Sequence, residues 1–337
     1  MTMHSSSSNS NGSLWMVVMV LTVTAQLVLA QQQQLLSVDY YNSSCPQLES
    51  IIFKVMVRKQ RANPTTAAGT LRIFFHDCFV EGCDASVLVS SMGAGHKAER
   101  DADINLSLPG DGFDAVARAK TAVEAQCPGV VSCADILTIA TRDLITLVGG
   151  PKYQVKKGRK DGLVSEASRV AGNLPEATMS VDELNALFES KGFNQSEMTT
   201  LSGAHTVGFS HCKEFMGRIY KEPMDPTIDP QYAAGLQKVC PQQNLDPNMA
   251  AFNDVLSPRT FDNVFYQNLP KGLGLLASDQ ILYTDARTIG LVETYASDQN
   301  AFFRDFALAM DKLGSVGVKT GYEGEIRKSC DAFNKHS

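Results

Sequence analysis

Hydrophobic residues recur at helical spacing along much of the chain. The segment 130–147 carries apolar residues on a broad face, and segments 113–123 and 302–313 repeat them every three or four positions. This period predicts helices that bury one face. A further helix should begin after Ser180, because Glu183 follows three residues later in the pattern of a capping box.

Patterns typical of strands are few and short. Only 153–155 and 275–282 favour a strand, and the chain has no internal repeat. We therefore predict an all-α protein with very little β structure, built as two helical lobes with one site between them. The segment 172–180, GNLPEATMS, combines Gly, Pro and polar residues and is the best candidate for the connection between the lobes.

The overall composition is that of an ordinary soluble protein. Of the 337 residues, 44% are hydrophobic and 20% are charged, and the formal net charge is −6. This balance gives no electrostatic footprint for nucleic acid, so we expect no nucleic-acid partner.

The N-terminal 30 residues differ from the rest. They contain no Lys, Arg, Asp or Glu, and 14–30 is nearly all apolar and ends in LVLA. With Val28 and Ala30 at the small-residue positions, this pattern predicts a signal peptide, 1–30, and a secreted protein 31–337. The alternative is an uncleaved anchor, for which the run is short of the ~20 apolar residues that span a bilayer.

All eight cysteines follow this leader. In a secreted chain an even number predicts four disulfides, although eight cysteines allow about 105 pairings and the sequence alone does not choose among them. A zinc site at His76, Cys78 and Cys83 is a weaker alternative, because the chain has no CxxC pair. Sequons at Asn42, Asn105 and Asn194 predict a glycoprotein, although Asn194 also fits a helix N-cap.

The segment 71–86, LRIFFHDCFVEGCDAS, places strong polar groups in an apolar setting. Arg72 and His76 are four residues apart, so on a helix they share one face. A permanent cation beside an imidazole lowers the pKa of the imidazole and keeps it neutral, able to act as a base. The acids and Ser86 that follow suggest oxygen ligands in a loop.

Two longer motifs carry a family resemblance. AGTLRIFFHDCFVEGCDASVL (68–88) and LSGAHTVGFSHC (201–212) resemble the distal and proximal haem signatures of the plant secretory (class III) haem peroxidases. PGVVSCADIL, GRKDG and SPRTFDN fit in the family's order, and the likeness covers about 35–330. It implies haem between a distal lobe (about 31–175 plus the C-terminal segment) and a proximal lobe (about 176–300). No CxxCH is present, so the expected cofactor is non-covalent haem b.

The resemblance also implies roles for individual residues. On the distal side, His76 resembles the acid–base histidine, Arg72 its partner cation and Phe75 the aromatic beside the iron. On the proximal side, His205 resembles the iron ligand, although in isolation it would read as a packed core histidine, and Asp279 resembles the carboxylate that orients it. Further implied residues are Asn105 as acceptor for His76 (the alternative being a glycosylated loop residue), Glu99 as the acid supporting that segment near the first calcium ion, and Pro175 at the donor site.

Two calcium sites and the disulfide pairing are likewise implied by the family. The first calcium set is Asp77, Val80, Gly82, Asp84 and Ser86, and the second is Thr206, Asp254, Ser257, Thr260 and Asp262. Oxygen-only sets of this kind suit a hard cation. The implied disulfides are Cys45–Cys127, Cys78–Cys83, Cys133–Cys330 and Cys212–Cys240, and Asp135 with Arg159 is expected to form a structural ion pair.

The expected activity is reduction of hydrogen peroxide to water with one-electron oxidation of small phenols such as monolignols, by a monomer. Two other classes are weighed against it: a wall-binding protein that has lost turnover, and a calcium-dependent adhesion module without haem. The presence of Arg72, His76 and His205 together favours the enzyme.

Overall fold

The computed structural model describes residues 36–91, 93, 95 and 97–334. The predicted signal peptide therefore lies outside the described residues. Within the described part, no helix combines the length and apolar character needed to cross a membrane.

The regular secondary structure of the described residues is almost entirely helical, which confirms the predicted fold class. Its helices are α2 (Leu48–Ala62), α3 (Thr66–Phe79), α4 (Gly110–Glu124), α5 (Cys133–Leu147), α6 (Val181–Ser190), α7 (Gln195–Ser202), α8 (Met216–Tyr220), α9 (Pro230–Val239), α10 (Val264–Asn268), α11 (Ala277–Thr284), α12 (Ile289–Ser297) and α13 (Gln299–Leu313). The described strands are β1 (Phe209–His211) and β2 (Ala250–Phe252), an antiparallel pair with Phe209 opposite Phe252.

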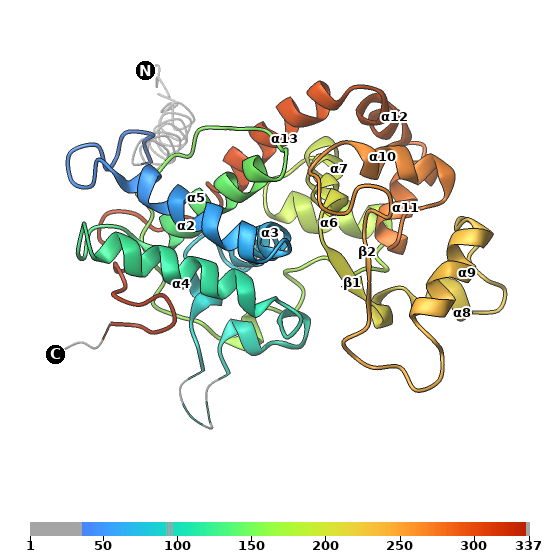
Figure 1. Ribbon diagram of the computed structural model, residues 1–337, viewed down its shortest axis with the longest axis horizontal. Coiled ribbons are helices and arrows are strands. Elements are labelled where there is room, and N and C mark those ends of the chain that lie inside the picture. The colour runs from blue at the N-terminus through green and yellow to red at the C-terminus, as the bar shows by residue number, and fades with distance from the viewer. Residues whose placement is uncertain (1–35, 92, 94, 96, 335–337) are drawn as a thin grey trace, which may run out of the picture.

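The helices gather in two groups. Helices α2–α5 pack on one another and form the first lobe, whereas α6–α13 form the second, in which α7 packs on α13 and α10 on α12. In Figure 1 the first lobe lies on the left, the second on the right, and α3 is at the centre. This places α3 where its side chains can face the second lobe.

Helix α3 is buried almost all round, which is unusual for a helix with polar residues. A close approach to α4 makes this possible: a Cβ on Gly112 would lie 2.7 Å from Ile73 Cδ1 and 3.1 Å from the Gly69 carbonyl carbon. Two glycines at this crossing therefore let the backbones meet, and α3 becomes a rigid, dry support for Arg72 and His76.

The helix signals in the sequence were sound, and both strand predictions were wrong. The Ser180 hydroxyl and the Glu183 carboxylate form the predicted capping box of α6, and Asn194 with Glu197 forms another at α7. The segment 275–282 instead enters α11, and 153–155 lies outside the described helices and strands. A short apolar run fits a buried helix as well as a strand, since its length does not resolve the period.

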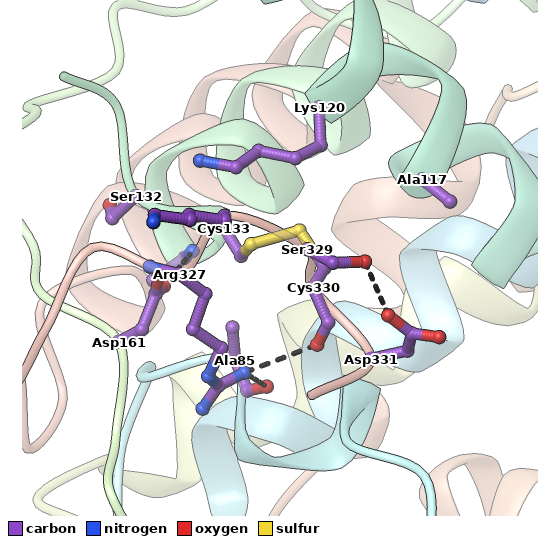
Figure 2. The surroundings of a disulfide bond; sticks show 12 residues. Ala85, Ala117, Lys120, Ser132, Cys133, Asp161, Arg327, Ser329, Cys330 and Asp331 are labelled. Carbon is purple, nitrogen blue, oxygen red and sulfur yellow. Dashed lines mark hydrogen bonds between the residues drawn. A yellow bond between two sulfur atoms is a disulfide. The ribbon is translucent and has the colours of Figure 1, made fainter. Parts of the chain in front are cut away.

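The C-terminal segment leaves the second lobe and returns to the first. After α13 it pairs with the first lobe at Lys160–Lys319 and Asp161–Glu325. Arg327 is fully buried, and its guanidinium donates to the carbonyls of Ala85 at 2.7 Å and Gly162 at 2.7 Å. Figure 2 shows Arg327 beside the disulfide between Cys133 and Cys330, which fastens the segment to α5.

Four disulfides are present, and no cysteine of the described chain is free. They join Cys45 to Cys127, Cys78 to Cys83, Cys133 to Cys330 and Cys212 to Cys240, the arrangement that the family resemblance implies. Cys78 and Cys83 are therefore not thiolates, and the zinc alternative is wrong. Asp135 and Arg159 form the expected ion pair, 2.7 Å apart and buried.

Candidate active site

His76 projects from α3 and is held by the loop between α3 and α4. Its side chain is 6% exposed, and its Nδ1 lies 2.6 Å from Asn105 Oδ1. The Asn105 amide nitrogen donates to the Glu99 carbonyl at 2.7 Å, so the amide oxygen is the atom that faces the ring. An oxygen can only accept here, so Nδ1 carries the hydrogen and Nε2 has a free lone pair.

The electrostatics keep this imidazole neutral. Burial, with the charge of Arg72 as a second contribution, lowers the pKa of His76 to about 3, and the bond to Asn105 opposes this only in part. A neutral ring with a free Nε2 is what a general base needs.

Arg72 is held by the same loop as His76. Its guanidinium donates to the Ser107 carbonyl at 3.0 Å, the Ser107 hydroxyl at 2.9 Å and the Ile104 carbonyl at 3.3 Å. Burial lowers the pKa of Arg72 to about 10, which leaves it charged at neutral pH. Ser107 was not identified from the sequence, although it is the third residue of the Asn105 sequon. Both polar residues of that sequon serve the site, and Asn105, 2% exposed, leaves no room for a glycan.

A second imidazole comes from the other lobe. His205 lies in a 3₁₀ turn, Gly203–Thr206, directly after α7, and its Nδ1 is 2.8 Å from Asp279 Oδ1 in the first turn of α11. Burial lowers the pKa of His205, but the charge of Asp279 and this bond outweigh burial and raise it. The side chain is 39% exposed while Asp279 is 2% exposed, and with Nδ1 bound to Asp279 the Nε2 atom is left for another partner.

The charge of Arg72 acts on both histidines. Phe75 is half-buried beside His76, with ring centroids 6.2 Å apart, and stacks on Phe79. These residues fit a haem group. An imidazole made more basic by a carboxylate, as in His205, suits an iron ligand, whereas His76 is kept neutral and can act as a base.

Oxygen-bearing residues surround the loop after α3. Asp77, Asp84, Ser86 and Glu99 are all at most 4% exposed. Burial and the neighbouring carboxylates raise the pKa of Asp77 to about 8 and that of Glu99 to about 9. Carboxylates crowded in this way are stabilised by a hard cation. Val80 and Gly82 lie in the same loop.

A second oxygen cluster follows the His205 turn. The Ser257 hydroxyl lies 3.1 Å from Asp254 Oδ2 and 3.0 Å from Asp262 Oδ1, and the Thr206 hydroxyl lies 3.2 Å from Asp262 Oδ1. The Thr260 carbonyl is 3.4 Å from the Thr206 hydroxyl. Within the described residues, no three His, Cys, Asp or Glu side chains form a preformed metal site.

Pro175 lies apart from these clusters. It is half-buried in the connection that enters α6, between buried Leu174 and exposed Glu176.

Comparison with known proteins settles the family. The family model described as peroxidase matches residues 52–298. This chain belongs to the peroxidase family. It is 53% identical over 320 residues to Peroxidase 65 of Arabidopsis thaliana, covering 95% of each chain. It is 55% identical to Peroxidase 41 of the same plant, covering 89% of this chain and 91% of the relative.

This peroxidase is accordingly an enzyme of the plant class III type, and the resemblance read from its motifs is confirmed. Membership implies a haem cofactor, hydrogen peroxide and a reducing substrate. It supports the enzyme over the two other classes considered, the inactive wall protein and the adhesion module without haem.

Proposed function

We propose that the peroxidase binds non-covalent haem b between His205 and His76 and oxidises small phenols, monolignols among them, at the expense of hydrogen peroxide. The observation that carries this proposal is a pair of imidazoles, one from each lobe, held in the same way. Each has Nδ1 engaged by a side-chain oxygen, Asn105 for His76 and Asp279 for His205, and each has Nε2 free. His205 would hold the iron, with Phe75 against the other side of the haem.

The chain's own residues then handle the proton and the charge. Haem iron, when bound, supplies the electrons that cleave the peroxide O–O bond. His76 Nε2 takes a proton from one peroxide oxygen and returns it to the other, which leaves as water. Arg72, fixed by Ser107, stabilises the negative charge that develops on the departing oxygen.

We further propose that the protein is secreted, on the basis of the leader 1–30, and that it acts as a monomer. Residues 31–175 with the C-terminal segment would form the peroxide side, and 176–300 the iron-ligand side. Pro175 would border the donor site. The test is a purified secreted protein: a Soret band and turnover of guaiacol and monolignols are expected. A protein that binds haem and consumes peroxide but oxidises no phenol would refute the donor class.

Replacing Asn105 by valine should slow peroxide cleavage while haem remains bound. Valine has similar bulk but no acceptor, so Nδ1–H loses its partner and the ring becomes a weaker, less well aimed base. We expect the rate to fall on the order of tenfold, because one hydrogen bond contributes ~1–1.5 kcal/mol. Stopped-flow absorbance after mixing with peroxide measures it.

Mass spectrometry of the secreted protein checks the same assignment independently. A glycan on Asn105 would place its side chain in solvent and end its role beside His76. Asn42, which is exposed, is the matched sequon at which a glycan is expected.

We propose a calcium ion at each oxygen cluster, and the second bears directly on His205. Thr206 follows His205 and touches Asp262, so loss of the cation should loosen the turn that carries the iron ligand. Prolonged chelation is expected to change the haem spin state and lower activity before global unfolding, and added Ca²⁺ should reverse both. Full activity and an unchanged spectrum with no bound calcium would contradict this.

A further inference from the structure

A row of aromatic rings leads away from His205 into the second lobe. The His205 ring centroid lies 6.3 Å from that of Phe265, Phe265 lies 5.0 Å from Tyr266, and Tyr266 lies 5.1 Å from Tyr295. All three contacts are edge-to-face, within the normal range for packed aromatic pairs. Because electron tunnelling weakens steeply with distance, a series of short steps is much faster than one long step.

Tyr266 is also joined to the backbone that carries the iron ligand. Its hydroxyl donates to the Thr199 carbonyl at 2.9 Å and lies close to the Thr200 carbonyl, 3.2 Å away. A Cβ on Gly203 would lie 2.4 Å from the same hydroxyl oxygen. Gly203 precedes His205 by two residues, so its lack of a side chain allows this phenol to pack directly on the segment.

Tyr295 ends the row with a proton acceptor. Its hydroxyl lies 2.9 Å from Asp305 Oδ2 and 2.8 Å from the Thr200 hydroxyl. A carboxylate only accepts, so the Tyr295 hydroxyl donates to Asp305. Tyr295 is 1% exposed, whereas the Asp305 side chain is 35% exposed. The proton of a buried phenol can therefore move to a group in contact with solvent.

The composition makes tyrosine the most readily oxidised side chain of the described protein. The only Trp is Trp15, which lies within the predicted signal peptide. Burial raises the pKa of both Tyr266 and Tyr295, so neither ionises by itself. Removal of an electron makes a phenol strongly acidic, and for Tyr295 an acceptor is already in place.

We propose that Tyr266 and Tyr295 form an electron relay, through which an oxidising equivalent leaves the haem and comes to rest on Tyr295 with its proton on Asp305. This proposal rests on the proposed function, since it needs haem on His205. After peroxide is reduced the haem lacks two electrons, and Tyr295 supplies one of them through Tyr266. A phenol at the surface then gives one electron to Tyr295, Asp305 returns the proton, and the donor's own proton goes to solvent.

The surface beside Asp305 suits such a donor. Leu308, one turn further along α13, is 67% exposed and offers an apolar contact for an aromatic ring. The relay would therefore accept phenols too bulky to reach the haem, including those attached to a polymer.

The test is electron paramagnetic resonance of the holoenzyme, frozen shortly after one equivalent of hydrogen peroxide. A tyrosyl radical signal is expected, and it should narrow when the protein is made with ring-deuterated tyrosine. Tyr295→Phe should abolish the signal, and Tyr266→Phe should lower it strongly. The matched control is Tyr232→Phe, which removes a buried hydroxyl without a hydrogen-bond partner and should leave the signal unchanged.

Asp305→Asn tests the same relay if the tyrosine variants fold poorly. Its side chain is partly exposed, so this change should disturb folding less. In the parent protein the radical yield should change when the solvent is D₂O, because the phenol proton moves to Asp305. Asp305→Asn should reduce the radical yield and abolish this change. Peroxide consumption and the Soret band, followed in each sample, separate the two hypotheses. A parent protein that binds haem but consumes no peroxide refutes the proposed function. A sample of Tyr295→Phe that consumes peroxide and shows an unchanged tyrosyl signal overturns the relay.

Discussion

Replacing His76 by alanine should lower the rate of peroxide cleavage by ~10²–10⁴ while leaving haem bound, because proton transfer by a placed side chain contributes that much. Among the described residues of the first lobe, His76 is the only histidine. Its bond to Asn105 fixes the hydrogen on Nδ1 and leaves Nε2 free to take a proton. Arg72 remains in this variant, so the residual rate reports its electrostatic contribution. Stopped-flow mixing with increasing peroxide gives the second-order rate constant.

A matched control is available in His211, the described histidine outside the site. His211→Ala in β1 should leave that rate constant unchanged. Peroxide cleavage at the parent rate in His76→Ala would show that the base is another group. Loss of haem from this variant would instead mean that His76, and not only His205, holds the iron.

Removing the Cys133–Cys330 disulfide should have the largest effect on stability. The two cysteines are 197 residues apart, and a loop of that size corresponds to about 5 kcal/mol in the chain-entropy model. The double variant Cys133→Ser with Cys330→Ser should lower the free energy of unfolding by up to this amount, since the other disulfides shorten the free loop. Denaturation in urea, followed by circular dichroism, measures the loss.

The Cys212–Cys240 pair provides the comparison, because it closes a loop of only 28 residues. The same relation gives about 3.6 kcal/mol for that pair. If the Cys212→Ser, Cys240→Ser protein were the less stable of the two, loop length would not govern these disulfides. The contacts of Arg327 alone would then suffice to hold the C-terminal segment.

The sequence pointed to Arg72 and His76 more readily than to the loop residues that hold them in place. Arg72 and His76 share a helix face because four residues make about one turn, which is local information. The loop that positions both is set by tertiary packing, and the sequon at Asn105 left a glycosylated loop residue as the weaker alternative. Ser107 therefore escaped notice, although its hydroxyl and carbonyl hold the guanidinium.

Secondary structure was predictable where caps and long periods were present. Ser180 with Glu183 marked α6 correctly, whereas the apolar run 275–282 was assigned to a strand. In the structure α11 places Asp279 in its first turn, and this turn brings the carboxylate to His205. Strands β1 and β2 are only three residues each, too short for a period of two to be recognised.

The return of the C-terminal segment to the first lobe has a consequence for biosynthesis. Cys133 leaves the ribosome long before Cys330, and at ~5–20 residues per second the 197 residues between them take roughly 10 to 40 s. Throughout that interval Ala85 and Gly162 lack the guanidinium that they bind in the finished protein. The first lobe therefore cannot complete its contacts before Cys330 emerges, and until then the native partner of the Cys133 thiol is missing.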